Sequence, residues 1–346
     1  MNAALRSLLT RIQPAGVVLF KRNIQSPAQT WTLLRECQKA VSIPLFRCVD
    51  LEGGTVDRFR DALGPSPAAA HVYATGDRKL YRQHGRMIGQ ACRLMGFNVD
   101  FAPALDLAFE ASRTVMGSRL VSDDPKKVVS YAREFLAGLK TAGVLGSGKH
   151  FPGLGEATLD THKELPAVKK KWKYLWEQDL VPYRLMRREL PMVMVSHAAF
   201  PAIDDSRTPA TLSKKWITDV LRKKVGYKGL VVTDDMEMGA LMAVAPIEKA
   251  TVGTVRAGTD LCLICHLEDL VTRGYEALVR EAERDKKFAA RVQESSRRVQ
   301  GMKKKTQGLR SFAPEPTESR IARLTREMWE LGERLRLEDI GSATKS

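Results

Sequence analysis

The sequence has few of the features that mark membrane-bound, secreted or disulfide-stabilised proteins. Its 346 residues contain no apolar run of about 18 residues, so no membrane-spanning helix is expected. The opening MNAALRSLLTRIQPAG has neither a long apolar segment nor a small-residue cleavage site, which argues against a secretory signal. Five cysteines at irregular spacings indicate no disulfide framework and are typical of a reducing compartment. We therefore expect a cytoplasmic protein without a membrane partner.

Acidic residues are scarce relative to basic ones. The chain has 56 Lys and Arg against 40 Asp and Glu, which gives a formal net charge of +16. Such a balance can indicate nucleic-acid binding, an anionic ligand or a solvated exterior. The basic clusters at 169–173, 222–224 and 297–305 come with neither an aromatic-interleaved RNA signature nor a zinc finger. We therefore expect no nucleic-acid partner and interpret the charge as a solvated face that attracts acidic ligands.

The sequence does contain a regular alternation of short apolar runs and helical segments. Hydrophobic residues make up 44% of the chain, which is enough for a large core. Alternating strands and helices indicate parallel strands joined by helices. Helical periodicity is clear at 28–41 and at 124–143, where an Asp-Pro pair begins the helix and Gly143 ends it. The strand-like runs are GVVLF (16–20), IPLFRCVD (43–50), NVDFAP (98–103), VLGSGKH (144–150), MVMVSH (192–197), LVVTDD (230–235) and LCLICH (261–266).

Polar residues follow most of these runs. A (β/α)8 barrel brings all its strand ends to one pocket, whereas a doubly wound sheet concentrates them at one crevice. The pattern therefore predicts an α/β fold, a (β/α)8 TIM-type barrel over 1–310, with a C-terminal helical extension over 311–346 that includes a charged helix at 318–340. Seven strands are recognisable instead of eight and none precedes residue 16, so the first barrel strand is expected to be missing. The polar residues are Asp50, Glu52, Asp106, Lys149, His150, His197, Asp234, Asp235 and His266.

Two motifs that suggest cofactors are set aside. GVLGSGKH (143–150) approaches a phosphate-binding loop, but His150 stands where Ser or Thr is needed, and Pro152 prevents the helix that should follow. CLICH (262–266) has the spacing for covalent haem attachment, yet it lies in an apolar strand-like run of a protein with no export signal. We expect no cofactor.

A metal site is the less favoured interpretation of the histidines and carboxylates. His150, Asp160, His162, His197 and Asp234 are residue types that build hydrolytic metal centres in barrels. However, the sequence contains no H-E-x-x-H pair on a helix and no His-x-His after an early strand. We expect no metal, and full activity in excess chelator would exclude a metal-dependent hydrolase.

Three local patterns point to chemistry on a bound ligand. In DLEGGTVDRF (50–59), Asp50 and Arg58 form either a tight turn with an ion pair or a clamp for hydroxyl groups, and the sequence leaves both open. In VVTDDMEMGA (231–240), Asp234 is placed to face the pocket as a nucleophile, whereas Asp235 is more simply a helix cap. In Asp160-Thr161-His162, the carboxylate can orient the imidazole, whose ordinary pKa of about 6.5 suits proton transfer.

Taken together, the motifs resemble a known family. KHFPG followed by DTH, with DLEGG, MGSR, VSHAAFPAID and VVTDD in this order, closely resembles glycoside hydrolase family 3, in particular the single-domain bacterial β-N-acetylglucosaminidases of cell-wall (peptidoglycan) recycling. The resemblance covers about residues 16–270. It implies a retaining double displacement in which Asp234 is the nucleophile, His162 on a mobile loop is the acid/base, and Asp160 orients His162.

The resemblance also implies which substrate is bound and which residues bind it. Substrate binding maps onto Asp50, Arg58, Arg119, Lys149 and His150, and the substrate would be a muropeptide, N-acetylglucosamine β-linked to anhydro-N-acetylmuramic acid. A monomer is expected. A β-N-acetylglucosaminide phosphorylase and a non-catalytic muropeptide-binding barrel remain alternatives.

The chain departs from the family pattern at two places. Leu154 stands where many relatives have His, and the relatives begin with an apolar strand that precedes the start of this chain. Either the start is placed too late or the barrel closes imperfectly. Restoring upstream coding sequence, if it exists, is expected to raise the melting temperature.

Overall fold

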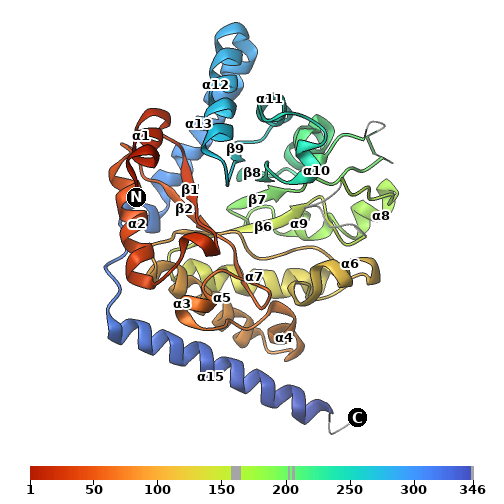
Figure 1. Ribbon diagram of the computed structural model, residues 1–346. Helices are drawn as coiled ribbons and strands as arrows, with labels where there is room; N and C mark the ends of the chain where they lie inside the picture. Colours follow the sequence, from red (N-terminus) through yellow and green to blue (C-terminus); the bar gives the residue numbers. More distant parts are fainter. Residues whose placement is uncertain (157–164, 202, 205–206, 344–346) are drawn as a thin grey trace.

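A curled parallel sheet of seven strands lies at the centre of the molecule (Figure 1). The computed structural model describes residues 1–156, 165–201, 203–204 and 207–343. All neighbours in the sheet order β1-β2-β5-β6-β7-β8-β9 pair in parallel. Each predicted strand-like run contains one strand, so the predicted α/β barrel architecture with seven strands is confirmed. The strands are β1 (Gly16–Val18), β2 (Phe46–Val49), β5 (Val99–Asp100), β6 (Leu145–Phe151), β7 (Met192–Val195), β8 (Leu230–Asp235) and β9 (Leu261–Leu263).

Helices join successive strands and surround the sheet (Figure 1). Residues 1–15 contain a helix and no strand, as the sequence predicts. The helices are α1 (Ala3–Ile12), η1 (Lys21–Asn23), α2 (Pro27–Lys39), α3 (Arg60–Leu63), α4 (Ala69–Ala74), α5 (Arg78–Leu94), α6 (Glu110–Met116), η2 (Gly117–Arg119), α7 (Pro125–Thr141), α8 (Trp172–Glu177), α9 (Val181–Leu185), η3 (Ala210–Leu212), η4 (Lys215–Lys224), α10 (Gly239–Met242), α11 (Ile247–Ala257), α12 (Glu268–Arg284), α13 (Lys286–Lys305), α14 (Gln307–Arg310) and α15 (Glu318–Ala343).

The ends of α7 follow the local sequence signals. The side chain of Asp124 accepts a hydrogen bond from the backbone N–H of Lys126 at 2.8 Å, and Pro125 occupies the first turn, where its missing N–H costs nothing. The chain leaves the helix at Gly143, whose φ of 76° suits glycine. The helix predicted at 124–143 therefore forms within a residue or two of its expected limits.

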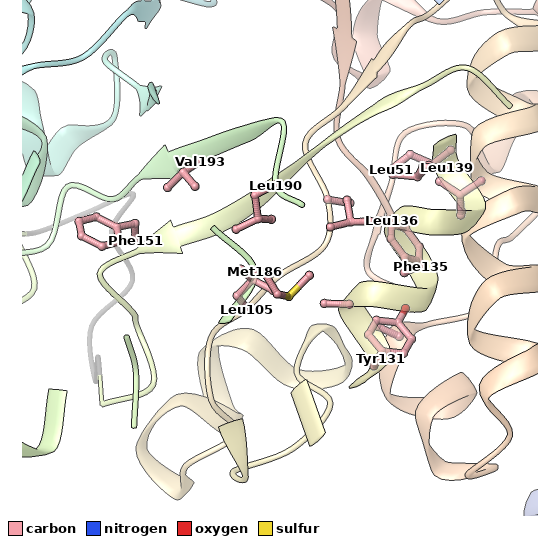
Figure 2. Packing of buried hydrophobic residues seen from close by; sticks show 14 of the residues in the cluster. Leu51, Leu105, Tyr131, Phe135, Leu136, Leu139, Phe151, Met186, Leu190 and Val193 are labelled. Atoms are coloured by element: carbon pink, nitrogen blue, oxygen red, sulfur yellow. The ribbon is translucent and has the colours of Figure 1, made fainter. Parts of the chain in front are cut away.

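The core has two layers. Inside the curled sheet, apolar side chains from β2, β5, β7 and β8 meet Val299 of α13 and Leu309 of α14, which close one end of the barrel. Outside the sheet, a larger cluster fills the space between the strands and the surrounding helices (Figure 2). In β6, a Cβ at Gly148 would lie 2.6 Å from Leu105 and 2.8 Å from Leu190, so glycine allows this close packing.

The two edge strands of the sheet do not pair with each other. Within the described residues the order begins at β1 and ends at β9, and both strands are half-buried. Side chains bridge the seam between them. The guanidinium of Arg22, after β1, donates to the carbonyl of Cys265, after β9, at 2.9 Å, and the ring centroids of Phe20 and His266 lie 5.2 Å apart. The barrel is therefore closed here by side chains where a strand ladder is absent.

The C-terminal segment packs on the outside of the barrel. The indole N–H of Trp31 in α2 donates to the carbonyl of Ala313 at 2.8 Å, and Phe312 meets the Trp31 ring edge-on. Helix α15 then runs across α5 and α3 (Figure 1). The helix predicted at 318–340 is thus present, while the proposed division into 1–310 and 311–346 stays a prediction.

Two further observations concern membrane-spanning helices and the state of the cysteines. None of the described helices combines the length and the apolar content that crossing a bilayer requires. All five cysteines lie in the described part and are free thiols.

Candidate functional site

A cavity of about 360 Å³ opens at the carboxyl ends of the strands. Asp160 and His162, the predicted acid/base pair, lie outside the described residues. The other six predicted site residues, Asp50, Arg58, Arg119, Lys149, His150 and Asp234, all line this cavity. The barrel topology therefore brings together residues that are up to 184 positions apart in the sequence (234 − 50). The remaining lining residues are Val18, Phe20, Glu52, Val56, Phe101, Val115, Met116, Leu154, Met194, Asp235, Met238, Leu263, Cys265 and His266.

The residues after β2 are held by an antiparallel hairpin, β3 (Leu51–Gly53) and β4 (Val56–Asp57). Gly53 has φ of 83°, and a Cβ there would collide with the carbonyl of Pro67. The Gly-Gly turn expected from the sequence is therefore required by both conformation and space. The carboxylate of Asp57 accepts from the N–H groups of Phe59 and Ser66, which fixes the segment that presents Arg58 to the cavity.

A buried ion network forms one wall of the cavity. Lys149 at the end of β6 contacts Asp50 at 2.7 Å and Glu52 at 2.6 Å. Arg119 pairs with both oxygens of Glu52 at 2.8 Å each. Burial alone would raise the pKa of Glu52, but Arg119 and Lys149 outweigh it and hold that pKa far below its usual range. Burial would also lower the pKa of Lys149, but Asp50 and Glu52 raise it, so the network is charged at neutral pH.

The imidazole of His150 is fixed from behind. Its Nδ1 donates to the carboxylate of Asp106 at 2.7 Å, and the backbone N–H groups of His150 and Leu154 donate to the same carboxylate. The peptide bond between Lys149 and His150 is cis. The Nε2 atom lies 3.3 Å from the guanidinium of Arg119. This leaves Nε2 and Arg119 side by side at the cavity wall, where both can contact a hydroxyl-rich ligand.

Asp234 is a second carboxylate of this cavity whose pKa is lowered, and no Lys or Arg forms an ion pair with it among the described residues. It lies near the end of β8, and one of its oxygens accepts from the N–H of Asp235 at 2.8 Å. Burial would raise the pKa of Asp234, but His150, His197, this N–H and Lys149 outweigh it and lower that pKa below its usual value. An ionised carboxylate with a low pKa can attack an electrophilic carbon.

The neighbouring residue, Asp235, has a role that the sequence did not predict. It was expected to cap a helix, but α10 begins at Gly239 and no side chain caps it. The carboxylate of Asp235 instead accepts from the N–H of Glu237 at 3.0 Å and contacts Nε2 of His266 at 2.9 Å. The carboxylate of Glu237 in turn accepts from the N–H groups at 265–267. These contacts tie the loop that carries Asp234 to the loop after β9.

His197 stands behind Asp234 and supports the loop from inside the barrel. This fully buried side chain contacts the carbonyl of Asp235 through Nε2 at 2.8 Å and the hydroxyl of Thr211 through Nδ1 at 2.9 Å. Across the residues that the structure describes, no group of three His, Cys, Asp or Glu side chains is arranged to hold a metal ion.

Glu52, Asp106 and His266 are site residues to which the sequence assigned no role. Each follows a predicted strand, and that position was the available signal. The sequence did not indicate the partner of each, namely Arg119, His150 and Asp235, because these partners come from distant segments of the chain. For Arg58, the sequence left an ion pair with Asp50 open. In the described structure Asp50 pairs with Lys149 instead.

The fold and the position of the cavity together are typical of barrel enzymes. The protein is an α/β barrel with a charged binding cavity at the carboxyl ends of its strands, the location of active sites in barrel enzymes.

Comparisons with known proteins identify the family. Residues 1–302 match the family described as glycosyl hydrolase family 3 N terminal domain. A β-hexosaminidase of Alkalilimnicola ehrlichii is 37% identical over 273 residues, which cover 77% of this chain and 78% of that protein. A β-hexosaminidase of Nitrosomonas eutropha is 36% identical over 261 residues, 73% and 74% of the two chains. The chain therefore belongs to glycoside hydrolase family 3 and is a glycoside hydrolase.

A solved structure supports the same assignment. The family 3 β-N-acetylglucosaminidase from Paenibacillus sp. str. FPU-7 superposes with a TM-score of 0.87 at 30% sequence identity. The match covers 95% of this chain and 65% of that structure, so this chain spans about two thirds of its length.

Proposed function

We propose that the protein is a retaining β-N-acetylglucosaminidase that releases terminal N-acetylglucosamine from muropeptides of the GlcNAc-anhydroMurNAc type in peptidoglycan recycling. The observation that carries the proposal is Asp234, whose carboxylate is held ionised in a cavity lined by groups that bind hydroxyls. The names of the relatives, β-hexosaminidase and β-N-acetylglucosaminidase, support the type of sugar.

The reaction would proceed by two displacements at the anomeric carbon. A carboxylate oxygen of Asp234 attacks this carbon while the bond to the leaving oxygen breaks, and His162 gives that oxygen its proton. A water molecule then attacks the same carbon and breaks the ester to Asp234, while His162 accepts the proton of the water. Asp160 orients His162 in both steps. Because Asp160 and His162 lie outside the described residues, their roles rest on the DTH motif.

The cavity wall that contains the ion network would bind the sugar. Asp50 and Lys149 form a charged pair at the cavity surface, where an acceptor and a donor can hold adjacent hydroxyls. Arg58, Arg119 and His150 add donors from other loops. Because Glu52 and Asp106 already position Arg119 and His150, little ordering remains when the sugar binds.

We also propose that the enzyme acts as a cytoplasmic monomer. Five free thiols are compatible with a reducing compartment.

The decisive experiment compares 4-nitrophenyl β-N-acetylglucosaminide with the corresponding β-glucoside. The wild type should hydrolyse the first, and Asp234→Ala should lower kcat by about 10⁴-fold or more. His162→Ala should lower kcat by about 10²- to 10⁴-fold. His71→Ala, on the exposed side of α4, is the matched control and should keep wild-type activity. Full activity of Asp234→Ala would refute the proposal.

Product analysis separates the alternatives. Free N-acetylglucosamine in the presence of phosphate supports hydrolysis, whereas sugar 1-phosphate identifies a phosphorylase. A protein that binds the muropeptide but turns over neither glycoside would be a binding barrel. Loss of activity in excess chelator would indicate a metal-dependent hydrolase.

A further inference from the structure

A buried lysine joins the two described ends of the loop that carries the DTH motif. Lys170 is almost fully buried, and its Nζ lies 2.8 Å from the carboxylate of Asp179 and 3.1 Å from that of Glu156. The same Nζ lies 4.1 Å from the ring centroid of Phe109, which directly precedes α6. Glu156 precedes the motif in the chain, and Lys170 follows it. We name these four residues the Lys170 cluster.

Each end of the loop is also attached to the barrel separately. Before the motif, the backbone N–H of Leu154 donates to the carboxylate of Asp106 at 2.7 Å. After the motif, the N–H of Val168 donates to the carbonyl of Ala199 at 2.8 Å, and the N–H of Ala199 donates to the carbonyl of Pro166 at 2.8 Å. The first end is thus tied to the segment after β5 and the second end to the segment after β7.

The cluster is closely packed and charged. A Cβ at Gly153 would lie 2.9 Å from the Cβ of Asp179, and a Cβ at Gly155 would lie 2.9 Å from the ring of Phe109. Burial raises the pKa of Asp179 to about 6, so this carboxyl is mostly ionised at neutral pH and forms a charged pair with Lys170. Removing the ammonium would leave Asp179 as a buried carboxylate without its countercharge.

The distance between the two ends bears on His162 because few residues separate them. His162 comes six positions after Glu156 (162 − 156) and eight before Lys170 (170 − 162). A change in the separation of the ends must be taken up within these residues, which include both members of the proposed acid/base pair. A general acid must lie within about 3 Å of the atom that it protonates. A displacement of about 1 Å can cost about 10²-fold in rate.

We infer that Lys170 is a positioning residue, which holds the two ends of the loop at the separation that His162 needs to protonate the leaving oxygen. Its ion pairs with Glu156 and Asp179 fix this separation. None of the four residues of the Lys170 cluster lines the cavity that contains Asp234, so the cluster acts through the loop and not on the sugar. The inference rests on the proposed function, because it takes His162 as the acid/base.

The test compares two aryl β-N-acetylglucosaminides. The 2,4-dinitrophenyl glycoside has a leaving group that departs without protonation, whereas the phenyl glycoside needs a general acid. The measured quantity is the ratio of kcat/KM for the dinitrophenyl over the phenyl glycoside, because kcat/KM includes the step that breaks the glycosidic bond. His162→Ala, which removes the acid itself, should raise this ratio by about 10²-fold or more.

Lys170→Met should raise the same ratio about tenfold, because it leaves His162 in place but displaced. Lys170→Arg keeps the charge and should restore most of the wild-type value. Lys169→Met removes the same charge from the adjacent, exposed residue and should leave the ratio unchanged.

A second variant decides the matter if Lys170→Met does not fold. Glu156→Gln removes the contact to the first end only and leaves the pair between Lys170 and Asp179 in place. It should raise the ratio about threefold, as expected for a partly exposed ion pair. In the double variant the ratio should equal that of Lys170→Met alone, because both substitutions break the same contact.

The outcomes separate this inference from the proposed function. An unchanged ratio in Lys170→Met and Glu156→Gln, with a raised ratio in His162→Ala, overturns the positioning role and leaves the proposed function intact. An equal fall of kcat/KM for both glycosides in Lys170→Met also overturns it, because Lys170 would then support only the fold. If His162→Ala keeps the wild-type ratio, His162 is not the acid, and the proposed mechanism fails together with the inference.

Discussion

At the scale of single residues, the cavity depends on Glu52. This carboxylate is almost fully buried and neutralises Arg119 and Lys149, which would otherwise be buried cations without a common partner. A buried pair of this kind is strongly destabilised when one member is removed. Glu52 therefore acts on the proposed sugar-binding residues by positioning them.

We predict that Glu52→Gln lowers the free energy of unfolding by about 3 kcal/mol at pH 7, because Gln keeps the shape but leaves Arg119 without its carboxylate and Lys149 with Asp50 alone. Urea unfolding followed by circular dichroism measures the change. Glu110→Gln is the matched control: it alters an exposed pair with Arg113 at 3.8 Å and should change the stability by less than about 0.5 kcal/mol. A change below 1 kcal/mol for Glu52→Gln would contradict the argument.

The pH dependence of the free energy of unfolding should also depend on Glu52. The pKa of Glu52 is depressed in the folded state relative to an ordinary 4.5, so its contribution is complete above about pH 4.5 and is lost as the pH falls toward the lower folded value. The wild type should therefore lose more stability between pH 5 and pH 3 than Glu52→Gln. If the free energy of unfolding falls equally in the two proteins between pH 5 and pH 3, Glu52 is not the cause of the loss of stability.

At the scale of elements, α15 illustrates what a periodic pattern can predict. Leu324, Met328, Leu331 and Leu335 are spaced for one face of a helix, and the structure buries all four. The sequence analysis predicted a charged helix here, and the structure shows that it also has an apolar face. The sequence did not predict the partners, α5 and α3, because a helical stripe indicates that a face is buried and not what covers it.

We predict that Leu331→Ala lowers the free energy of unfolding by about 2–3 kcal/mol, since it opens a cavity between α15 and the barrel. Trp329→Ala, two residues earlier on the exposed face, should change it by less than about 0.5 kcal/mol. Thermal unfolding should remain a single transition if α15 unfolds with the barrel. A separate early transition in Leu331→Ala would instead support 311–346 as an independent unit.

At the scale of the whole molecule, α13 places a buried cation at one end of the barrel. Lys303 of α13 donates to the carbonyl of Ala15, just before β1, and its Nζ lies over the ring of Phe46 in β2. Burial lowers the pKa of Lys303 to about 8, since no carboxylate accompanies it among the described residues. The carbonyl of Ala15 also accepts from the backbone N–H of Phe46 at 3.0 Å, so the buried cation of Lys303 is not required to satisfy it.

We predict that Lys303→Met raises the stability at pH 7 by about 1 kcal/mol, because it replaces a poorly solvated cation by an apolar side chain of similar length. The destabilising effect of the buried Lys303 cation can be tested by measuring stability as a function of pH. The unfolded chain binds this proton more tightly than the folded protein, so wild-type stability should rise between pH 8 and pH 10.5, and Lys303→Met should lack that rise. Lys305→Met, at an exposed position of the same helix, is the control. A destabilised Lys303→Met would show that the bond to Ala15 dominates.

The sequence by itself determined the order of the strands, the helices between them and the set of polar residues at the strand ends. These depend on periodicity and on capping signals such as Asp124 and Gly143, which act over a few residues. The motif order also identified the family, as the comparisons confirm.

Only the tertiary structure decided which polar groups pair. Lys149 meets Asp50 across 99 positions, Arg119 meets Glu52 across 67, and Asp235 contacts His266 instead of capping a helix. The seam between β1 and β9, closed by side chains around Phe20, is likewise visible only in three dimensions. Such pairings arise when the curled sheet brings separate strand ends within a few ångströms of one another, and no local pattern in the chain specifies that distance.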